Sequence, residues 1–291
     1  MASLKTQNRY LTSIDELYRI LNCKDIVIID TREPEDYNFE HIPGSINIYD
    51  IFTYLSTKEN GGYEAMQNHF AQLFAQAGIS GSEEVIVYED AMDNGYGRSC
   101  RGYFILKNLG YTKVTVLHGG FQAWNRKNLP VTKEIPLPTP KLFPVSIDNS
   151  ILVNSAEMLA SLTDKSIIKL DVRDHAEWIG VSSSPYGPDF APRKGRLPGA
   201  IWLEWYNMMK NVHSIPWFKE PDELKEIFTK VGIKSDSNVI IYCFKGARTS
   251  NVYICMKMAG IENVRCYFGA WNEWSRDPEL PIQTGYPKRN F

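Results

Sequence analysis

The chain has 291 residues, a formal net charge of −2 and five cysteines. This length suggests two domains, and the near-neutral charge gives no general attraction to nucleic acid or to an anionic membrane. The cysteines are widely spaced and form no CxxC or Cys/His cluster, which argues against a zinc site and a disulfide framework. No apolar run reaches membrane-spanning length and the start has no apolar signal core, so we expect a cytoplasmic protein without metal or cofactor.

The predicted elements occur twice along the chain. The first copy has a capped helix start at residues 12–17, strands at 26–29, 85–88 and 114–117, a Pro-Gly turn at 43–44 and a Gly-Gly-Phe turn at 119–121. The second copy has the corresponding features at 154–159, 167–170, 239–242, 264–267, 198–199 and 269–271. The two halves are therefore copies of one domain.

A proline-rich connector separates the copies, with prolines at 136, 138, 140 and 144. Proline at this density predicts an extended linker. We therefore expect a domain at 1–132, a linker at 133–146 and a second domain at 147–291. In each half short apolar strands alternate with helical segments, which predicts an α/β domain whose parallel sheet is covered by helices.

The strand at 239–242 ends at Cys243, and a short loop leads from this cysteine into a helix. An isolated cysteine at a strand end is usually an inert core thiol. Here, however, Lys245 and Arg248 follow within five residues, and we expect Thr249 or Ser250 to cap the next helix. Cations and the amide N–H groups of a helix start favour the thiolate, so Cys243 is the predicted nucleophile.

The repeat serves as an internal control, because a feature of both copies is expected to serve the fold. The Asp-x-Arg pairs that end the second strand, Asp30 with Arg32 and Asp171 with Arg173, occur in both and are predicted to be loop braces. The first copy has Glu89 where the second has Cys243, in a longer acidic loop at 89–98. We therefore expect the first domain to be catalytically inactive.

With these features the chain resembles the tandem-domain rhodaneses, a family of sulfurtransferases. The resemblance covers nearly the whole chain and includes the inactive first domain, the linker, the Asp-x-Arg strand ends and the cysteine loop. It implies two parallel five-stranded sheets flanked by helices, with the active site in a cleft between domains. It also implies thiosulfate sulfurtransferase activity, in which Cys243 takes the outer sulfur of thiosulfate as a persulfide and passes it to cyanide or a thiol in a ping-pong cycle.

In this interpretation Lys245 and Arg248 bind the oxyanions of the donor. The predicted substrate-binding set is completed by Phe244, Gly246, Ala247 and Thr249, and the predicted supporting residues are Asp171, Arg173 and Arg193. One departure concerns Glu177, which stands where vertebrate-type members have a second arginine. An insertion at residues 178–196 contains Tyr186, Arg193 and Lys194, and either replaces that charge or packs on the interface.

Two alternatives stay open, and a third, a cysteine phosphatase, is disfavoured by the length of the loop. Relatives that use 3-mercaptopyruvate typically have an uncharged Cys-Gly-(Ser/Thr)-Gly-Val-Thr loop, whereas the loop here is basic, which favours thiosulfate. A persulfide carrier that serves a protein partner fits the same residues. A cysteine phosphatase needs Cys-x5-Arg, and Cys243 to Arg248 is one residue short. The expected partners are a small sulfur donor and a thiophilic acceptor, with no nucleic acid and no membrane, and we expect a monomer.

Overall fold

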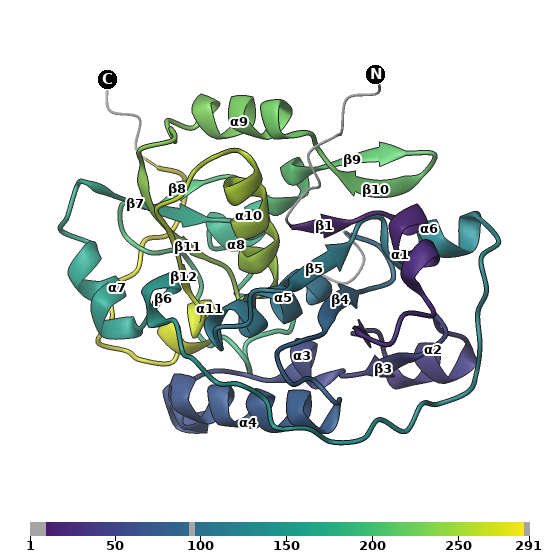
Figure 1. Ribbon diagram of the computed structural model, residues 1–291. Coiled ribbons are helices and arrows are strands. Elements are labelled where there is room, and N and C mark those ends of the chain that lie inside the picture. The colour runs from purple at the N-terminus through teal and green to yellow at the C-terminus, as the bar shows by residue number, and fades with distance from the viewer. Residues whose placement is uncertain (1–9, 93–96, 288–291) are drawn as a thin grey trace. The chain divides into compact units, whose positions relative to one another are not determined.

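The computed structural model describes residues 10–92 and 97–287 (Figure 1). The predicted acidic loop at 89–98 is thus described except for residues 93–96, and the stretch 1–9 lies outside the described residues. The chain divides into two compact units: residues 1–52, 71–146 and 211–217 form the first, and residues 53–70, 147–210 and 218–291 form the second. In the described part of the chain, no helix has the length and apolar character needed to cross a membrane.

These units are not continuous in sequence, because two segments belong to the unit that the repeat would not assign them to. Residues 211–217 count with the first unit, where Ile215 lies in a core cluster with Tyr88 and Trp124. Residues 53–70 count with the second unit, where the Tyr63 hydroxyl donates to the carbonyl of Val153. The boundaries 1–132, 133–146 and 147–291 follow the repeat and stay a prediction.

The first unit contains a five-stranded parallel sheet in the order β1-β5-β4-β2-β3. Its strands are β1 (Leu11–Thr12), β2 (Ile26–Asp30), β3 (Ser45–Asn47), β4 (Glu84–Tyr88) and β5 (Val114–Leu117). The helices from this part of the chain are α1 (Ile14–Ile20), α2 (Pro34–Phe39), α3 (Asp50–Thr53), α4 (Gly62–Gln76), α5 (Arg98–Asn108) and α6 (Gly120–Arg126), with a 3-10 turn η1 (Lys58–Asn60).

The second unit repeats this topology, with the sheet order β6-β12-β11-β7-β8. Its strands are β6 (Leu152–Val153), β7 (Ile167–Asp171), β8 (Ile201–Trp202), β11 (Asn238–Tyr242) and β12 (Val264–Tyr267). Its helices are α7 (Ser155–Ser161), α8 (His175–Trp178), α9 (Pro221–Lys230), α10 (Ala247–Met258) and α11 (Ala270–Trp274), with 3-10 turns η2 (Asn149–Ile151) and η3 (Trp205–Met208). A separate two-stranded sheet joins β9 (Met209–Val212) and β10 (Ile215–Phe218).

The predicted fold class is confirmed in both units. The central strands β4 and β11 are buried from their second residue onward, as expected for β-branched strands covered on both faces. The carboxyl ends of parallel strands meet at one edge of a sheet, which is where reactive residues gather in such folds. In the second sheet this edge brings together Asp171, Tyr242 and Tyr267, which are paired in register.

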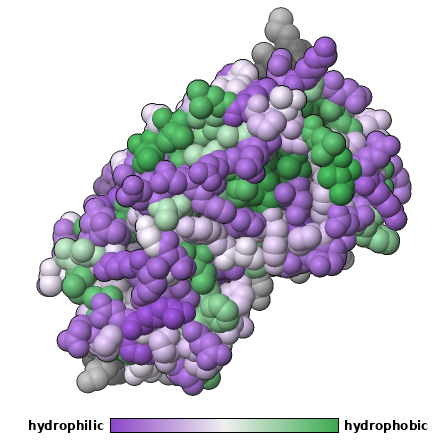
Figure 2. All heavy atoms as spheres, turned by 90° about the horizontal axis from the view of Figure 1, so that it is seen from below, coloured by the Kyte–Doolittle hydropathy of each residue, from purple (hydrophilic) through white to green (hydrophobic). Residues whose placement is uncertain are grey.

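The linker has no regular element from residue 133 to residue 148 and is anchored on the first unit. Phe143 is buried against the rings of Phe74 and Tyr111, with centroids 5.5 and 5.7 Å away. Lys141 forms a salt bridge of 2.6 Å with Glu83. On the face shown in Figure 2, hydrophobic side chains lie among hydrophilic ones.

Candidate active site

Cys243 follows the last residue of β11 and lies at the start of the loop that leads into α10. Its Sγ accepts a hydrogen bond of 3.2 Å from the N–H of Gly246, and the residue is 1% exposed. The carbonyls of Cys243 and Phe244 accept the N–H groups of Trp271 and Asn272, each at 3.0 Å. The loop is therefore held on both sides, with the sulfur turned toward the N-terminal end of a 12-residue helix.

The helix starts earlier than the sequence predicts. Gly246 is the N-cap of α10 with φ 96°, so the expected capping by Thr249 or Ser250 is wrong. A left-handed φ is easy only for glycine, and a Cβ here would lie 2.6 Å from the ring of Phe268. Ser250 instead donates to the carbonyl of Gly246, and the Thr249 hydroxyl is buried in the first turn of the helix.

Lys245 follows Cys243 by two residues, and its ammonium lies over the ring of Tyr186 from the insertion. Its Nζ is 4.7 Å from the ring centroid of Tyr186, and that ring is 4.8 Å from the ring of Phe244. Lys245 is 8% exposed. An ammonium over an aromatic face is attracted to the ring while its stem is covered, so the Lys245 ammonium has a defined position, two residues after the thiol.

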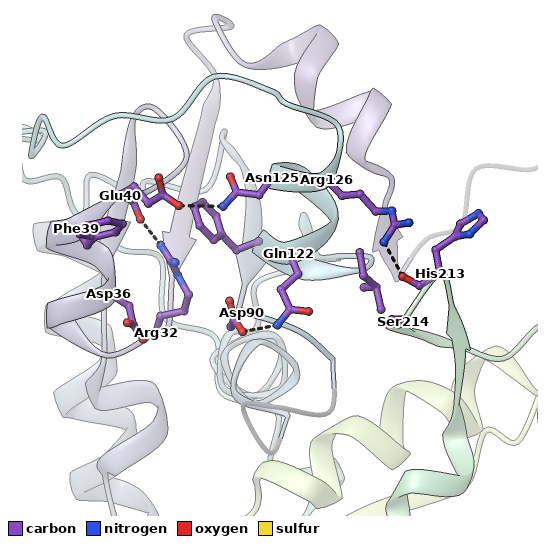
Figure 3. A pocket seen from close by; sticks show the side chains of 12 residues that line it. Arg32, Asp36, Phe39, Glu40, Asp90, Gln122, Asn125, Arg126, His213 and Ser214 are labelled. Carbon is purple, nitrogen blue, oxygen red and sulfur yellow. Dashed lines mark hydrogen bonds between the residues drawn. The ribbon is translucent and has the colours of Figure 1, made fainter.

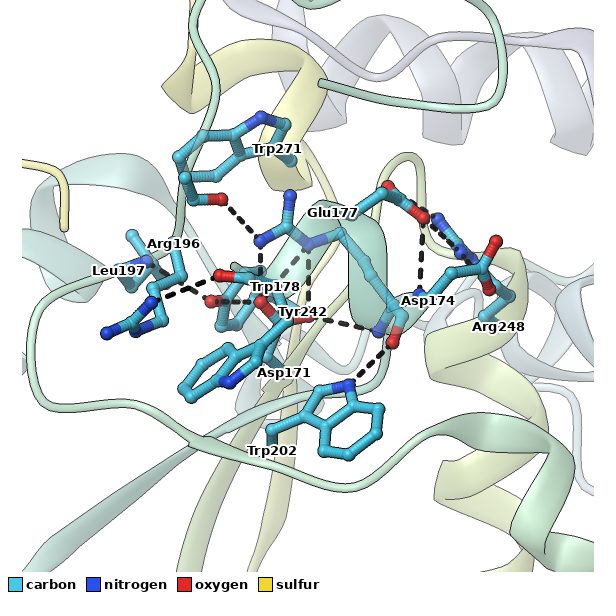
Figure 4. Close-up of polar contacts among 12 residues, drawn as sticks. Asp171, Asp174, Glu177, Trp178, Arg196, Leu197, Trp202, Tyr242, Arg248 and Trp271 are labelled. Atoms are coloured by element: carbon cyan, nitrogen blue, oxygen red, sulfur yellow. Dashed lines mark hydrogen bonds and ion pairs between the residues drawn. The ribbon is translucent and has the colours of Figure 1, made fainter. Parts of the chain in front are cut away.

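Arg248 is bound by two carboxylates that follow β7 (Figure 4). Its guanidinium donates to Glu177 at 2.6 and 3.1 Å and to Asp174 at 3.1 Å. Burial by itself acts to lower the pKa of Arg248, but the Glu177 carboxylate, with Cys243 and Asp174, raises it well above its usual value. The arginine is thus charged, buried and already paired.

A buried brace holds the strand ends beneath this loop. Arg173 donates to both carboxylate oxygens of Asp171, and the Tyr242 hydroxyl donates to Asp171 at 2.6 Å (Figure 4). Arg173 also donates to the carbonyl of Gly195 and lies 4.4 Å over the ring of Trp271. Burial, followed by the Asp171 charge, raises the pKa of Tyr242 well above its usual range, so this hydroxyl stays protonated as a donor.

The first unit contains the same brace. Arg32 donates to Asp30, to which the Tyr88 hydroxyl also donates, and its guanidinium lies 3.8 Å over the ring of Phe121. The Asp-x-Arg pairs are therefore salt bridges within each unit, as the repeat predicts. Since the brace occurs with and without a cysteine beside it, it serves the loop architecture of both units.

Arg193, a predicted supporting residue, caps a helix. Its guanidinium donates to the carbonyls of Trp274, Ser275, Asp277 and Leu280 at and beyond the end of α11. A cation that binds the last carbonyls of a helix satisfies acceptors that have no partner within the helix. This guanidinium holds α11, which in turn donates to the cysteine loop through Trp271 and Asn272.

Glu89 occupies the position of the thiol in the first unit. Its carboxylate accepts the N–H of Arg98 at 2.7 Å and the hydroxyl of Ser99 at 3.0 Å at the start of α5. Burial raises the pKa of Glu89 to about 8. The first unit therefore keeps the hydrogen-bond donors of a helix start at this position, and a side chain of its own accepts from them.

A polar pocket of about 680 Å³ also lies in the first unit (Figure 3). Within it Glu40 accepts from Asn125, Asp90 accepts from Gln122, and Arg126 donates to the carbonyl of His213. None of the predicted substrate-binding residues lines it. Because several of its polar side chains are paired and no cysteine of the described residues lines it, we do not place the reaction there.

The partner of Arg248 is what the sequence analysis missed. Glu177 was noted only as a departure from a family pattern, although Asp174 and Glu177 show the spacing of a capping box, which the structure contains. That spacing places Asp174 at the N-cap and Glu177 in the first turn of a helix, and a buried carboxylate such as that of Glu177 requires a cation nearby. Among the residues described, no group of three His, Cys, Asp or Glu side chains is placed to hold a metal ion.

Comparison with known proteins agrees with this architecture. The family model of the rhodanese-like domain matches residues 13–127 and 154–277. Thiosulfate sulfurtransferase from Rattus norvegicus is 28% identical over 258 residues, covering 86% of this chain and 83% of the relative. Thiosulfate sulfurtransferase from Azotobacter vinelandii is 23% identical, covering 92% of this chain and 94% of the relative.

Two solved structures are similar across almost the whole chain. EanB in complex with ergothioneine, covalently linked with a persulfide cysteine, matches with a TM-score of 0.83 and 26% identity, covering 99% of this chain and 72% of that one. SseA from Escherichia coli, a 3-mercaptopyruvate sulfotransferase, matches with a TM-score of 0.76 and 23% identity, covering 91% of this chain and 99% of that one. Both domain matches and the fold agree: the chain belongs to the rhodanese family and carries two rhodanese-like domains.

Proposed function

We propose that the chain is a sulfurtransferase that takes the outer sulfur of thiosulfate onto Cys243 and passes it to cyanide or a thiol. The observation that carries this proposal is the thiol at the start of α10, whose Sγ accepts the Gly246 N–H. A helix start with free N–H groups stabilises a negative charge, as on a thiolate or on the terminal sulfur of a persulfide. The rat and Azotobacter relatives bear the name thiosulfate sulfurtransferase, which supports the same reaction.

In the first half-reaction the Cys243 thiolate attacks the outer sulfur of thiosulfate. A new S–S bond forms, the bond between the two thiosulfate sulfurs breaks, and its electron pair leaves with sulfite. In the second half-reaction the acceptor attacks the outer sulfur of the persulfide and Cys243 regains its thiolate. The cycle needs no metal and no organic cofactor. Because Cys243 is 1% exposed, the reactive sulfur of a donor must lie at the end of the molecule.

Donor binding falls mainly to Lys245 and the loop backbone in this proposal. Arg248, predicted from the sequence to bind the donor directly, is held by Glu177 and Asp174 and would have to leave them. We therefore assign Arg248 the role of fixing the start of α10, and with it the cysteine loop, to α8. Phe244, Gly246, Ala247 and Thr249 shape the loop around the sulfur, and Asp171, Arg173 and Arg193 support it from behind.

The other cysteines are poor nucleophiles by comparison. Burial raises the pKa of Cys255 and of Cys266 well above the usual value. Cys23 is exposed but lies outside any such loop, and Cys100 is fully buried within α5. Every cysteine of the described residues is a free thiol, in keeping with a cytoplasmic setting for the reaction.

A thiosulfate:cyanide assay that measures both sulfite and thiocyanate tests the proposal. Intact mass after thiosulfate treatment should show one added sulfur, which is absent from Cys243→Ser and kept in the control Cys23→Ser. Sulfur retained in Cys243→Ser would overturn the assignment. Sulfite release without turnover of cyanide or thiols would instead indicate a carrier that serves a protein partner, and a higher kcat/KM with 3-mercaptopyruvate would change the donor.

A further inference from the structure

The insertion at residues 178–196 is a feature of the second copy alone. From Asp171 to Pro198 there are 27 positions, whereas the matching step from Asp30 to Pro43 takes 13. Both copies build the same sheet and the same Asp-Arg pair, so the extra length is not required for either of these features. A feature found only in the copy that has the nucleophile is a candidate for its chemistry.

This insertion is fixed to the second unit by its backbone carbonyls. The carbonyl of Phe190 accepts from Asn272 at 2.6 Å, that of Arg193 from Trp271 at 3.0 Å and that of Gly195 from Arg173 at 2.7 Å. The donors on α11 belong to the element that also holds the cysteine loop. Side chains of the insertion therefore have a defined position relative to Cys243.

Two aromatic rings of the insertion stand at the loop and face solvent. Tyr186 is 36% exposed and Phe190 is 44% exposed, with their centroids 6.1 Å apart in an edge-to-face arrangement. The Tyr186 ring also covers Phe244 and the ammonium of Lys245. An accessible aromatic surface thus adjoins the ammonium of Lys245, which lies two residues after Cys243.

This aromatic surface adds no affinity for thiosulfate, because thiosulfate is a small dianion without apolar area. An aromatic ring contributes affinity through stacking and burial of apolar surface, while the ammonium contributes through an anionic group. A ligand that uses both must be flat or apolar and must bear a negative charge. The two half-reactions share one site, so once sulfite has left, such a ligand is the sulfur acceptor.

We propose that Tyr186 determines the sulfur acceptor and selects an aryl thiol that carries a carboxylate. This inference rests on the proposed function, because it requires the Cys243 persulfide. The acceptor ring stacks on Tyr186 and its carboxylate binds Lys245. The acceptor thiolate attacks the outer sulfur of the persulfide; a bond forms between those sulfurs, the bond to Cys243 Sγ breaks, and its electron pair remains on Cys243 as thiolate. The transferred sulfur keeps its negative charge as the outer sulfur of the aryl persulfide.

The test compares 4-mercaptobenzoate with cyanide as acceptors for the thiosulfate-loaded full chain. Tyr186→Ala should lower kcat/KM for 4-mercaptobenzoate about tenfold more than it lowers kcat/KM for cyanide. Tyr186→Phe should keep the wild-type value, and Tyr18→Ala, which removes an exposed tyrosine of the first unit, should change neither acceptor. Equal losses with both acceptors would overturn the proposal and leave Tyr186 as a support for Lys245.

Binding of unreactive benzoate, measured by calorimetry, separates this inference from the proposed function. Weaker benzoate binding by Tyr186→Ala supports the aryl carboxylate site even if thiosulfate yields no persulfide, in which case only the proposed function fails. Persulfide formation together with benzoate binding that is the same in wild type and Tyr186→Ala overturns the inference alone.

Discussion

The ion pair between Arg248 and Glu177 connects the start of α10, beside the cysteine loop, to α8, the helix that follows β7. Both side chains are almost fully buried, at 3% and 2% exposure, and two hydrogen bonds join them. Removing one partner of a buried pair typically costs about 3–5 kcal/mol, because the remaining charge has lost its compensation. We therefore choose Glu177→Gln, which keeps the shape of the side chain and removes its charge.

The expected loss lies toward the lower end, at about 3 kcal/mol, since Asp174 stays 3.1 Å from Arg248 and glutamine still accepts one hydrogen bond. In a chain of this size such a loss lowers the thermal midpoint by roughly 6–12 °C. The measurement is thermal and urea unfolding followed by tryptophan fluorescence, with the transition of the second unit identified by limited proteolysis.

The first unit offers a matched control. Arg98 pairs with Glu33 at 3.1 Å, but the side chains are 14% and 40% exposed, so Glu33→Gln should cost less than about 1 kcal/mol. The double variant Glu177→Met with Arg248→Met removes both charges and should be more stable than Glu177→Gln. If Glu177→Gln unfolds at the wild-type midpoint, or at a midpoint no lower than that of Glu33→Gln, the pair does not hold the loop as argued.

Three further outcomes are expected. Lys245→Ala should lower kcat/KM for thiosulfate roughly ten- to a hundred-fold, because a charge-assisted contact of about 1.5–3 kcal/mol is lost. Lys225→Ala on α9 is the control and should leave kcat/KM unaffected. Unchanged turnover by Lys245→Ala would show that the donor is bound elsewhere. Glu89→Gln should keep turnover within a few-fold. The carboxyl of Glu89 has a pKa raised from 4.5 to about 8, so its contribution to stability is complete below pH 4.5 and lost as pH rises through 8. The unfolding midpoint of Glu89→Gln should therefore rise relative to that of wild type as pH increases across this interval. A difference between the two midpoints that does not change with pH would contradict the raised pKa. Gly246→Ala should abolish sulfur loading of Cys243, because the added Cβ would meet the ring of Phe268. Gly232→Ala is the control, since Gly232 also has a positive φ but has open space around it, and this variant should keep sulfur loading. Equal sulfur loading of the two variants would show that the contact of the new Cβ with Phe268 is unimportant.

Local sequence pattern was sufficient for three strands of each sheet, for the repeat and for the place of Cys243 at the end of a strand. The predicted strands at 114–117 and 264–267 have the bounds of β5 and β12, and those at 85–88 and 239–242 differ from β4 and β11 by one residue. Of these, β4, β5 and β11 are short runs rich in β-branched residues, a composition that local pattern detects. The start of α10 was misplaced because serine and threonine are common caps, while the loop instead uses the positive φ of Gly246.

Only the tertiary structure decided which charges are available to a substrate. Arg248 and Glu177 lie 71 residues apart, and Tyr186 lies 59 residues before Lys245, so no local spacing connects them. The parallel pairing of β7 with β11 brings the two strand ends to one edge of the sheet, and the loops that follow them then meet. For that reason a loop that is basic in sequence contains one arginine already neutralised by carboxylates and one lysine held against an aromatic ring.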